Sequence, residues 1–290
     1  EPGVTWRDVV ARAGARLPGD EAWFVGEEAS GWDRAELVRR FDEPAPERLA
    51  AYAESMVDRR VAGEPLQYVL GRWGFRGLDL MVDRRVLIPR PETETVVDVA
   101  LDELRRTFAA AGDRAAGPPF VVDLGTGSGA IALAVATEVA DALVWATDVS
   151  DDALAVARAN LAGSGSAVGP RVRLATGRWF EALPDALRGR VDLIVSNPPY
   201  VAEGEALPPE VAEWEPRPAL VAGSTGLEAI GEVVGGARGW LARPGALVVE
   251  VAPHQAEAAA AMARETGLVD VEVRDDLAGR PRVLVARTVG

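Results

Sequence analysis

The sequence predicts an α/β protein, in which a small helical segment and a β-hairpin precede a mostly parallel sheet that ends in an antiparallel strand. The main observation is an alternation that begins at residue 120, where short runs of Val, Leu and Ile alternate with stretches of helical apolar spacing. Such alternation is typical of parallel strands joined by right-handed helical crossovers. The runs lack a polar residue at every second position, which indicates strands that are covered on both faces.

A small helical domain is expected over residues 1–65. Apolar residues recur there at helical spacing, as in Trp6, Val9 and Ala13, and Gly and Pro residues separate the segments. These apolar stripes indicate a core of packed helices rather than a cofactor site.

Residues 66–90 differ in character and predict a β-hairpin linker. Its strands are expected at 75–82 and 86–88, with the turn near residues 83–84. The main domain is then expected to occupy residues 91–290.

Local signals define the elements of this main domain. A helix is expected to begin at Pro91, because Pro suits a first helical turn and the acids Glu92 and Glu94 lie near the positive end of the helix dipole. The last two strands flank residues 275–281 and are expected to pair antiparallel and close the sheet. The expected strands are 120–124, 143–147, 171–175, 191–196, 246–251, 269–274 and 282–286, and further helices are expected from about residue 130 and near 150–161, 227–241 and 254–266.

The strand at residues 191–196 ends in a sequence that we expect to form a binding pocket. Pro198 and Pro199 lack the N–H group that a strand needs, so the strand must stop at Asn197. Ligands bind at the carboxyl ends of strands in open parallel sheets. The Asn197 amide, the Pro198 carbonyl and the Tyr200 ring are therefore expected to offer acceptors to an NH₂ group. A turn without function is the competing interpretation, but the chain contains only two Asn residues, so an Asn here is less easily incidental.

A second candidate site follows the first strand of the sheet, where residues 123–130 indicate a strand end, a glycine-rich turn and a helix start. Glycines let the backbone approach a ligand, and the free N–H groups of the helix start face it. Gly125, Gly127 and Ala130 also fit the dinucleotide pattern G-x-G-x-x-G/A. Asp148 then lies where it can bind ribose hydroxyls, so a Rossmann dehydrogenase is an alternative. A third glycine in the turn, an acid in the first strand and the lack of an evident hydride-transfer acid or base argue against it.

Composition excludes several kinds of site. The chain has no Cys and only one His, His254, so it can build neither a disulfide, a thiolate nucleophile, a His-based triad nor a Cys- or His-rich metal site. The net charge of −14 is spread over segments of mixed sign, so we expect no direct binding of nucleic acid. No apolar run approaches the length of a membrane span and no signal-like segment is seen, so we expect a soluble, cytoplasmic protein without a membrane partner.

The chain resembles the class I S-adenosylmethionine-dependent methyltransferases and, within them, the peptide chain release factor glutamine methyltransferases. The resemblance covers nearly the whole chain and implies a Rossmann-like sheet preceded by a helical domain and a hairpin linker. It also implies S-adenosyl-L-methionine as cofactor, with S-adenosyl-L-homocysteine as product. The resemblance is most specific at residues 87–94, 123–132, 179–180 and 197–200, with further matches at 215–220, 250–255 and 279–283.

Roles for single residues follow from this resemblance. Donor binding is implied for Gly125, Thr126, Gly127, Ser128, Gly129, Asp148, Trp179 and Asn197. Asp123 is added to this set, because its carboxylate can hold a cationic amino group or order the glycine turn. The implied catalytic residues, which hold the glutamine amide, are Asn197, Pro198, Pro199 and Tyr200. No metal is implied.

One departure from the family concerns the acid that usually precedes the Trp-Phe pair. Here Arg178 precedes Trp179. If that acid contacts the adenine amino group of the donor, Arg178 cannot replace it, and a backbone carbonyl or Asp192 would have to do so.

The proposed pocket suits a conjugated nitrogen. A carboxamide nitrogen is a weak nucleophile, because its lone pair is delocalised into the carbonyl. The Asn197 oxygen and the Pro198 carbonyl can each accept one N–H and turn the lone pair toward the sulfonium methyl, so positioning replaces a general base.

The substrate stays open among several classes. The same motif serves exocyclic adenine amines, so adenine N6 methylation is an alternative, together with a ribosomal-protein glutamine and a nucleotide-binding module without catalysis. The acidic balance of the chain favours a protein glutamine, that of the Gly-Gly-Gln motif of peptide chain release factors. We expect the helical domain to dock this partner and the enzyme to be a monomer.

Overall fold

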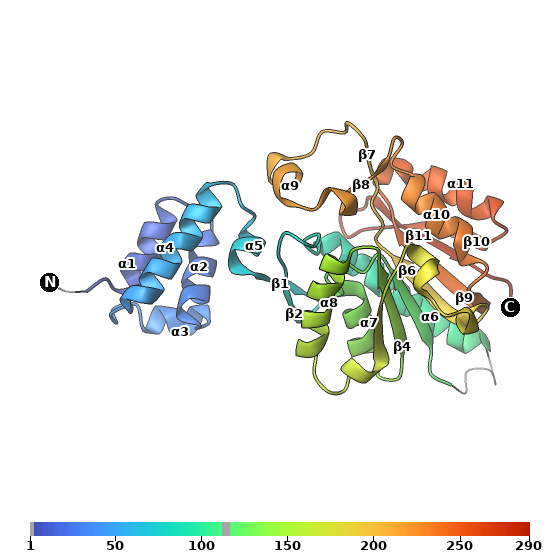
Figure 1. Cartoon of the computed structure of the whole chain (residues 1–290), viewed down its shortest axis with the longest axis horizontal. Helices are drawn as coiled ribbons and strands as arrows, with labels where there is room; N and C mark the ends of the chain where they lie inside the picture. Colours follow the sequence, from blue (N-terminus) through green and yellow to red (C-terminus); the bar gives the residue numbers. More distant parts are fainter. Residues whose placement is uncertain (1–2, 112–116) are drawn as a thin grey trace. The chain divides into compact units, whose positions relative to one another are not determined.

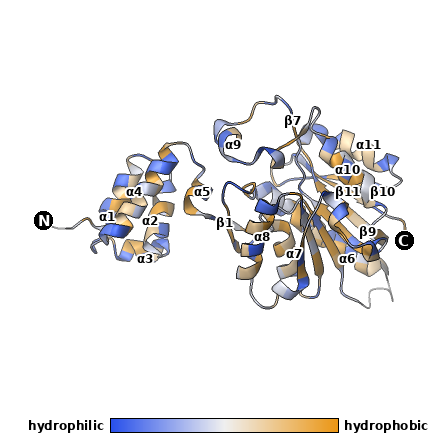
Figure 2. Cartoon of the chain, in the orientation of Figure 1, coloured by the Kyte–Doolittle hydropathy of each residue, from blue (hydrophilic) through white to orange (hydrophobic). Residues whose placement is uncertain are grey.

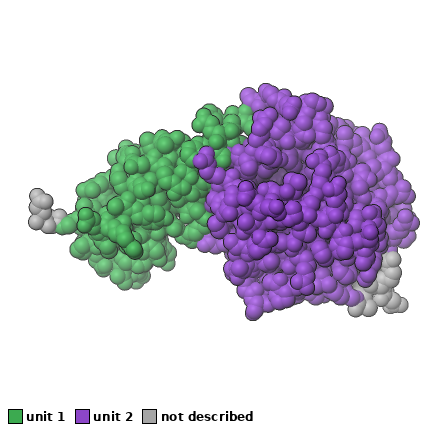
Figure 3. Space-filling view, in the orientation of Figure 1, with its two compact units in different colours: residues 1–73, 207–214 green, residues 74–206, 215–290 purple. Residues whose placement is uncertain are grey.

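The chain divides into two compact units, which Figure 3 colours separately. The computed structural model describes residues 3–111 and 117–290. The first unit comprises the chain up to Trp73 together with Leu207–Trp214, and the second comprises Gly74–Ala206 and Glu215–Gly290. The segment Leu207–Trp214 therefore groups with residues that lie far earlier in the sequence.

Helices build the first unit (Figure 1). Its core contains large apolar side chains that are at most 1% exposed, among them Trp6, Val25, Leu37 and Met56. The helical spacing of apolar residues therefore reflects packing between helices. The helices are α1 (Trp6–Gly14), α2 (Glu21–Ser30), α3 (Arg34–Arg39), α4 (Glu47–Val61), α5 (Leu66–Leu70) and α9 (Pro209–Trp214).

Among the described residues, a seven-stranded sheet forms the centre of the second unit, with the order β10-β11-β9-β6-β3-β4-β5. The strands are β3 (Phe120–Leu124), β4 (Leu143–Asp148), β5 (Val172–Thr176), β6 (Val191–Ser196), β9 (Leu241–Glu250), β10 (Val269–Asp275) and β11 (Pro281–Arg287). Strands β9, β6, β3, β4 and β5 are parallel to their neighbours in this series, whereas β11 is antiparallel to β9 and β10. The predicted mostly parallel sheet with an antiparallel last strand is confirmed.

Helices cover both faces of this sheet, so neighbouring residues of one strand enter different cores. The helices are α6 (Pro91–Ala111), α7 (Ala130–Glu138), α8 (Asp151–Gly163), α10 (Glu228–Ala237) and α11 (Ala256–Glu265). Val121 packs in the core that contains α6 and α7, and Val122 packs in the core that contains α10 and α11. Figure 2 accordingly shows the strands of the sheet as mostly hydrophobic. No helix within the described residues has both the length and the apolar character that crossing a bilayer requires.

The hairpin lies earlier than the sequence predicts. Its strands are β1 (Arg72–Phe75) and β2 (Leu78–Met81), and residues 86–88 form no strand. The turn residues, 76–77, have positive φ angles of +46° and +75°, as a two-residue hairpin turn requires. Arg rarely adopts this conformation, so the sequence gives no sign of a turn at Arg76. The strand predicted at 75–82 therefore wrongly includes the two turn residues.

Two further differences concern connections. The sequence predicts a helix that continues to residue 241, but α10 already ends at Ala237. Strand β9 therefore begins at Leu241, earlier than predicted. A small parallel sheet of β7 (Val201–Ala202) and β8 (Val221–Gly223) is not predicted, since neither strand is long enough to show a period. Short 3₁₀ helices lie at Gly169–Arg171, Trp179–Ala182, Asp185–Leu187, Arg217–Ala219 and Pro253–Gln255.

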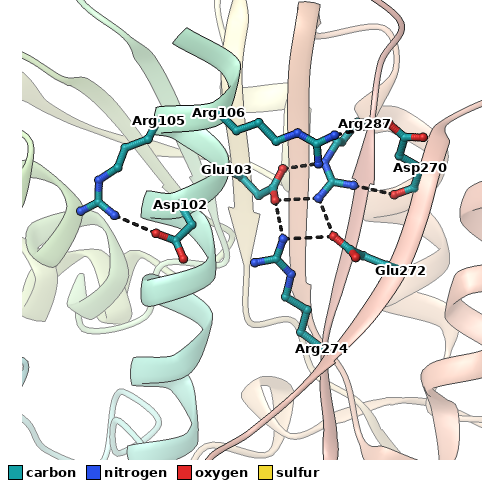
Figure 4. A network of polar contacts seen from close by, with 8 residues as sticks. All are labelled: Asp102, Glu103, Arg105, Arg106, Asp270, Glu272, Arg274 and Arg287. Carbon is teal, nitrogen blue, oxygen red and sulfur yellow. Dashed lines mark hydrogen bonds and ion pairs between the residues drawn. The ribbon is translucent and has the colours of Figure 1, made fainter. Parts of the chain in front are cut away.

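A buried ion-pair network joins α6 to the closing strands (Figure 4). Glu103 of α6 is 1% exposed, and its two carboxylate oxygens accept hydrogen bonds of 2.6 Å from Arg287 of β11. Arg274 of β10 donates to Glu103 at 2.8 Å, and Glu272 accepts from both arginines. Removing the Glu103 carboxylate would deprive two arginines of their buried partner. The network therefore connects the first helix of the unit with its last two strands.

Candidate active site

A cavity of about 410 Å³ opens at the carboxyl ends of β3, β4 and β6. Ligands bind at this position in open parallel α/β sheets. Two segments, residues 85–89 and residues 216–222, the second of which includes a 3₁₀ helix and the start of β8, complete its wall. Of the predicted site residues, the wall contains Gly125, Thr126, Gly127, Ser128, Asp148, Trp179, Asn197 and Pro199, whereas Asp123, Gly129, Pro198 and Tyr200 are not part of it.

The glycine-rich loop after β3 folds over the end of β4. The backbone N–H groups of Gly125 and Thr126 both donate to the carbonyl of Thr147, at 2.8 and 2.9 Å. Gly125 has a φ of +72°, and a Cβ atom there would lie 3.3 Å from the Trp179 ring. A side chain at this position would therefore be strained and crowded, so glycine lets the loop and the indole form one wall.

Asp123 lies beneath this loop and is fully buried. Its Oδ2 accepts hydrogen bonds from Thr126 Oγ1 at 2.6 Å and from the Ala132 N–H at 3.1 Å, so the carboxylate orders the glycine turn. Its Oδ1 is buried and accepts no hydrogen bond from the described residues. Desolvation raises the pKa of Asp123 to about 7. The loop therefore rests on a carboxyl group whose charge changes near neutral pH.

Asp148 ends β4 and borders the cavity. Its carboxylate accepts the N–H groups of Gly127 and Ser150, each at 2.9 Å. Burial raises the pKa of Asp148. Each carboxylate oxygen can accept more than one hydrogen bond, so Asp148 can also accept from a ligand hydroxyl in the cavity.

Trp179 and Arg178 share one partner on α10. The Trp179 Nε1 donates to Glu232 at 2.7 Å, and the Arg178 guanidinium forms a two-point ion pair with the same carboxylate, at 2.7 and 2.6 Å. The main-chain carbonyl of Trp179 accepts from Thr147 Oγ1 at 3.2 Å. Glu232 thus holds the indole in the cavity wall and engages the arginine that departs from the family pattern.

Asp192 cannot provide the missing acid near the donor, contrary to one expectation. It is the second residue of β6, and its carboxylate accepts from the N–H of Phe120, the first residue of β3, at 2.8 Å. Strands rise about 3.3 Å per residue, which places Asp192 roughly 16 Å from Asn197 along the strand direction. The sequence leaves a backbone carbonyl and Asp192 as possible replacements for the acid. Only the backbone carbonyl remains compatible with the fold.

A hydrogen-bonded chain lies behind Asn197. The Asn197 Nδ2 donates to Thr93 Oγ1 at 3.2 Å, and Thr93 Oγ1 lies 2.7 Å from Glu250 Oε2. The Tyr200 hydroxyl donates to the other oxygen, Glu250 Oε1, at 3.3 Å. Desolvation raises the pKa of both Glu250 and Tyr200. Sequence reasoning assigns no role to Thr93 or Glu250, although both lie in segments that resemble the family.

The backbone after Asn197 is held from below. Gln255 Nε2 donates to the Tyr200 carbonyl at 2.8 Å, and a Cβ atom at Gly226 would lie only 2.5 Å from that carbonyl oxygen. Before the motif, Ser196 Oγ donates to the Leu124 carbonyl at 2.6 Å and connects the ends of β6 and β3. These contacts fix the motif on the sheet, and the packing of the Tyr200 ring on a substrate amide stays a prediction.

Asn160, the other Asn of the chain, connects three segments around the site. From α8, its Oδ1 accepts the Met81 N–H at 2.7 Å, and its Nδ2 donates to the carbonyls of Met81 and Ser128 at 3.0 and 2.8 Å. Met81 ends β2, and Ser128 belongs to the glycine loop. Only the rarity of Asn in this chain distinguishes Asn160 at the level of sequence. No local pattern reveals hydrogen-bond partners that are so distant in the sequence.

Glu215 connects the two outer loops of the cavity wall. This buried carboxylate accepts the Ile88 N–H at 3.1 Å and pairs with Arg90. The loops at residues 85–89 and 216–222 are therefore joined at their bases.

Two protein-family models match the chain. The PrmC N-terminal domain matches residues 5–71, and the Methyltransferase small domain matches residues 96–213. The chain is also 44% identical to the release factor glutamine methyltransferase of Bordetella pertussis, over 96% of this chain and 97% of that protein. The chain belongs to the release factor glutamine methyltransferase family.

Further relatives agree with this membership. The release factor glutamine methyltransferase of Geobacter sulfurreducens is 43% identical to this methyltransferase, over 94% of this chain and 89% of that protein. The catalytic domain of hMettl16, solved in complex with MAT2A 3'UTR hairpin 1, is 16% identical with a TM-score of 0.57, over 94% of each chain. At that identity the likeness shows the fold alone, a class I methyltransferase with a Rossmann-like sheet. Family membership sets aside the dehydrogenase alternative.

Proposed function

We propose that this methyltransferase transfers a methyl group from S-adenosylmethionine to the side-chain amide nitrogen of the glutamine in the Gly-Gly-Gln motif of a peptide chain release factor. The Asn197 amide carries the proposal. It borders the cavity while its Nδ2 donates to Thr93, and among the described residues nothing donates to its Oδ1. That oxygen is therefore available to accept an N–H from a substrate, and family membership supplies the substrate class.

The residues around the glycine loop fit the methyl donor. The Asp148 carboxylate retains acceptor capacity for ribose hydroxyls. Backbone at Gly125 and Gly127 leaves room for a ligand to approach, and the Trp179 ring offers an apolar wall for a base. Beneath them, Asp123 orders the glycine turn without bordering the cavity. This set is proposed to hold S-adenosylmethionine and, after transfer, S-adenosylhomocysteine.

The chain's own residues position the glutamine amide. When bound, the donor would supply an electrophilic methyl group: the N–CH₃ bond would form as the S–CH₃ bond breaks, leaving a neutral thioether, and the proton released from the nitrogen would pass to solvent water. Asn197 Oδ1 and the Pro198 carbonyl are proposed to accept the two amide N–H groups, which directs the nitrogen lone pair toward the methyl. The nearby carboxylate of Glu250 does not compete for these protons, because it is not part of the cavity wall and lies behind Thr93.

The helical first unit is proposed to dock the release factor. Every residue in the cavity wall belongs to the second unit, so the first unit is free for protein recognition. It also exposes apolar side chains, those of Val38, Tyr52 and Val61. Replacing these three with Asp should raise KM for a full-length release factor and leave KM for a short Gly-Gly-Gln peptide unchanged. The proposal further takes the enzyme to act as a cytoplasmic monomer, without direct contact to nucleic acid.

Methyl transfer to a purified release factor tests the function. With radiolabelled donor at moderate salt, the parent release factor should be labelled, and a variant with Asn in place of the motif glutamine should not. An adenine-containing oligonucleotide at the same concentration should stay unlabelled, because phosphate binding draws on clustered basic residues that this acidic chain lacks. Label on the oligonucleotide, or equal label on both release factors, would disprove the proposal.

A further inference from the structure

We infer that Glu250 and Thr93 are positioning residues, which set the direction of the Asn197 amide so that its oxygen, not its nitrogen, faces the substrate. This inference rests on the proposed function and extends it to residues outside the segment 197–200. The oxygen and nitrogen ends of an amide have nearly the same shape, so hydrogen-bond partners decide which end points where. Asn197 has one such partner among the described residues, Thr93 Oγ1 at 3.2 Å.

Thr93 has a single hydroxyl proton, and its neighbours determine where that proton goes. Glu250 Oε2 lies 2.7 Å from Thr93 Oγ1, and an ionised carboxylate can only accept. The proton of Thr93 must then point to Glu250, and Oγ1 offers only lone pairs to Asn197. Asn197 has to present Nδ2 to Thr93, and its oxygen is consequently directed away from Thr93.

Burial of Thr93 and Glu250 favours this single direction of the hydrogen bonds. Glu250 is 1% exposed and is not part of the cavity wall, and Thr93, which borders the cavity, is 3% exposed, so little of either side chain is open to water. The second oxygen of Glu250 accepts from the Tyr200 hydroxyl at 3.3 Å, which is also a donor. Desolvation raises the pKa of Glu250, whereas the hydrogen bonds from Thr93 and Tyr200 and the positive charge of Arg282 favour its ionised form. The carboxylate therefore accepts a hydrogen bond on each of its oxygens. Glu250 thus sets the direction of the Thr93 hydroxyl, and Thr93 sets the direction of the Asn197 amide.

The chemical consequence concerns turnover. If the Asn197 amide were reversed, it would present NH₂ to the NH₂ of the substrate, and neither group could accept from the other. Donor binding takes place at the glycine loop and Asp148 and does not depend on this direction. Loss of this direction should therefore lower kcat and leave donor affinity unchanged.

A double-mutant cycle on the full-length enzyme tests the inference. Thr93→Val keeps the shape but removes the hydroxyl, and we expect kcat to fall on the order of 10- to 100-fold. Glu250→Gln can donate to Thr93, which frees the hydroxyl to point either way, and we expect a fall of about 10-fold. In the Thr93→Val background, Glu250→Gln should cause no further loss, because the path is already interrupted.

Thr93→Ser is the matched control, since it keeps the hydroxyl and should retain kcat within about threefold of the parent. Donor affinity, measured by calorimetry, should be the same in all variants, and melting temperatures report whether each variant folds. If Thr93→Val does not fold, Thr93→Ala replaces it in the cycle. The inference is overturned if Glu250→Gln lowers kcat by the same factor with and without the Thr93 hydroxyl, or if removal of the hydroxyl leaves kcat at the parent value. A parent enzyme that labels no release factor would instead disprove the proposed function.

Discussion

Replacing Asn160 with Asp should loosen the support of the glycine loop. The substitution keeps the size of the side chain and its Oδ1, which can still accept the Met81 N–H. It replaces Nδ2 with an oxygen that faces the carbonyls of Met81 and Ser128, 3.0 and 2.8 Å away. Two hydrogen bonds of about 1 kcal/mol each are lost, and the buried Ser128 carbonyl loses its partner at a cost of about 1 kcal/mol more. The free energy of unfolding should fall by roughly 3 kcal/mol.

A melting experiment at pH 8, where the new carboxyl is largely ionised, measures this effect. For a domain of this size, 1 kcal/mol corresponds to about 2–4 °C, so Tm should fall by roughly 6–12 °C. Ala159→Asp is the matched control, because it adds the same charge at an exposed position of the same helix. Donor affinity should weaken in Asn160→Asp and not in Ala159→Asp, since only Asn160 contacts the loop. A Tm for Asn160→Asp within about 2 °C of the control would refute the reasoning.

Three further predictions concern charges and the amide of the site. Asp148→Ala should raise the Kd of S-adenosylmethionine about 10- to 150-fold, which corresponds to the loss of charge-assisted hydrogen bonds of about 1.5–3 kcal/mol; calorimetry measures it, and unchanged affinity would contradict the role of Asp148. Asn197→Ala should lower kcat about 100-fold or more with little change in donor affinity, measured by single-turnover labelling; an equal loss in both would contradict an orienting role. Asp123 has a folded-state pKa of about 7, raised above its unfolded value, so the folded state binds more protons between about pH 4 and pH 7 and the parent loses stability as pH rises through that range. Asp123→Asn removes this titration, so its Tm relative to the parent should rise from pH 5 to pH 8, and a difference that does not change with pH would show that the carboxyl does not titrate there.

Much of the fold follows from local signals. The sequence predicts β3 and β6 to the residue, because glycines or prolines end each strand and both faces of each strand are buried. It misplaces the hairpin, because the turn uses Arg76 in a conformation that residue type does not reveal. The sequence also predicts a helix that extends beyond the end of α10. An apolar strand follows soon after this helix, and the apolar spacing does not show where the helix ends and the strand begins.

In the site, too, some residues can be predicted from the sequence and others cannot. Gly125, Asp148 and Asn197 are predictable because each lies at the carboxyl end of a recognisable strand. The partners that orient them are not, because hydrogen bonds join Asn160 to Met81 across 79 positions and Thr93 to Glu250 across 157 positions. No local period or spacing encodes such contacts.

The position of β11 in the sheet has a consequence for folding during synthesis. Although β11 comes last in sequence among the strands of the described sheet, it lies between β10 and β9. A ribosome-bound chain that has not yet produced residues 281–287 therefore has β9 as an unpaired edge and no partner in the sheet for β10. Glu103, made far earlier, also waits for Arg287, which donates to both of its carboxylate oxygens. Nascent chains of this length would expose an apolar strand edge to other chains, so the interval before β11 emerges is the one in which this protein most needs protection from aggregation.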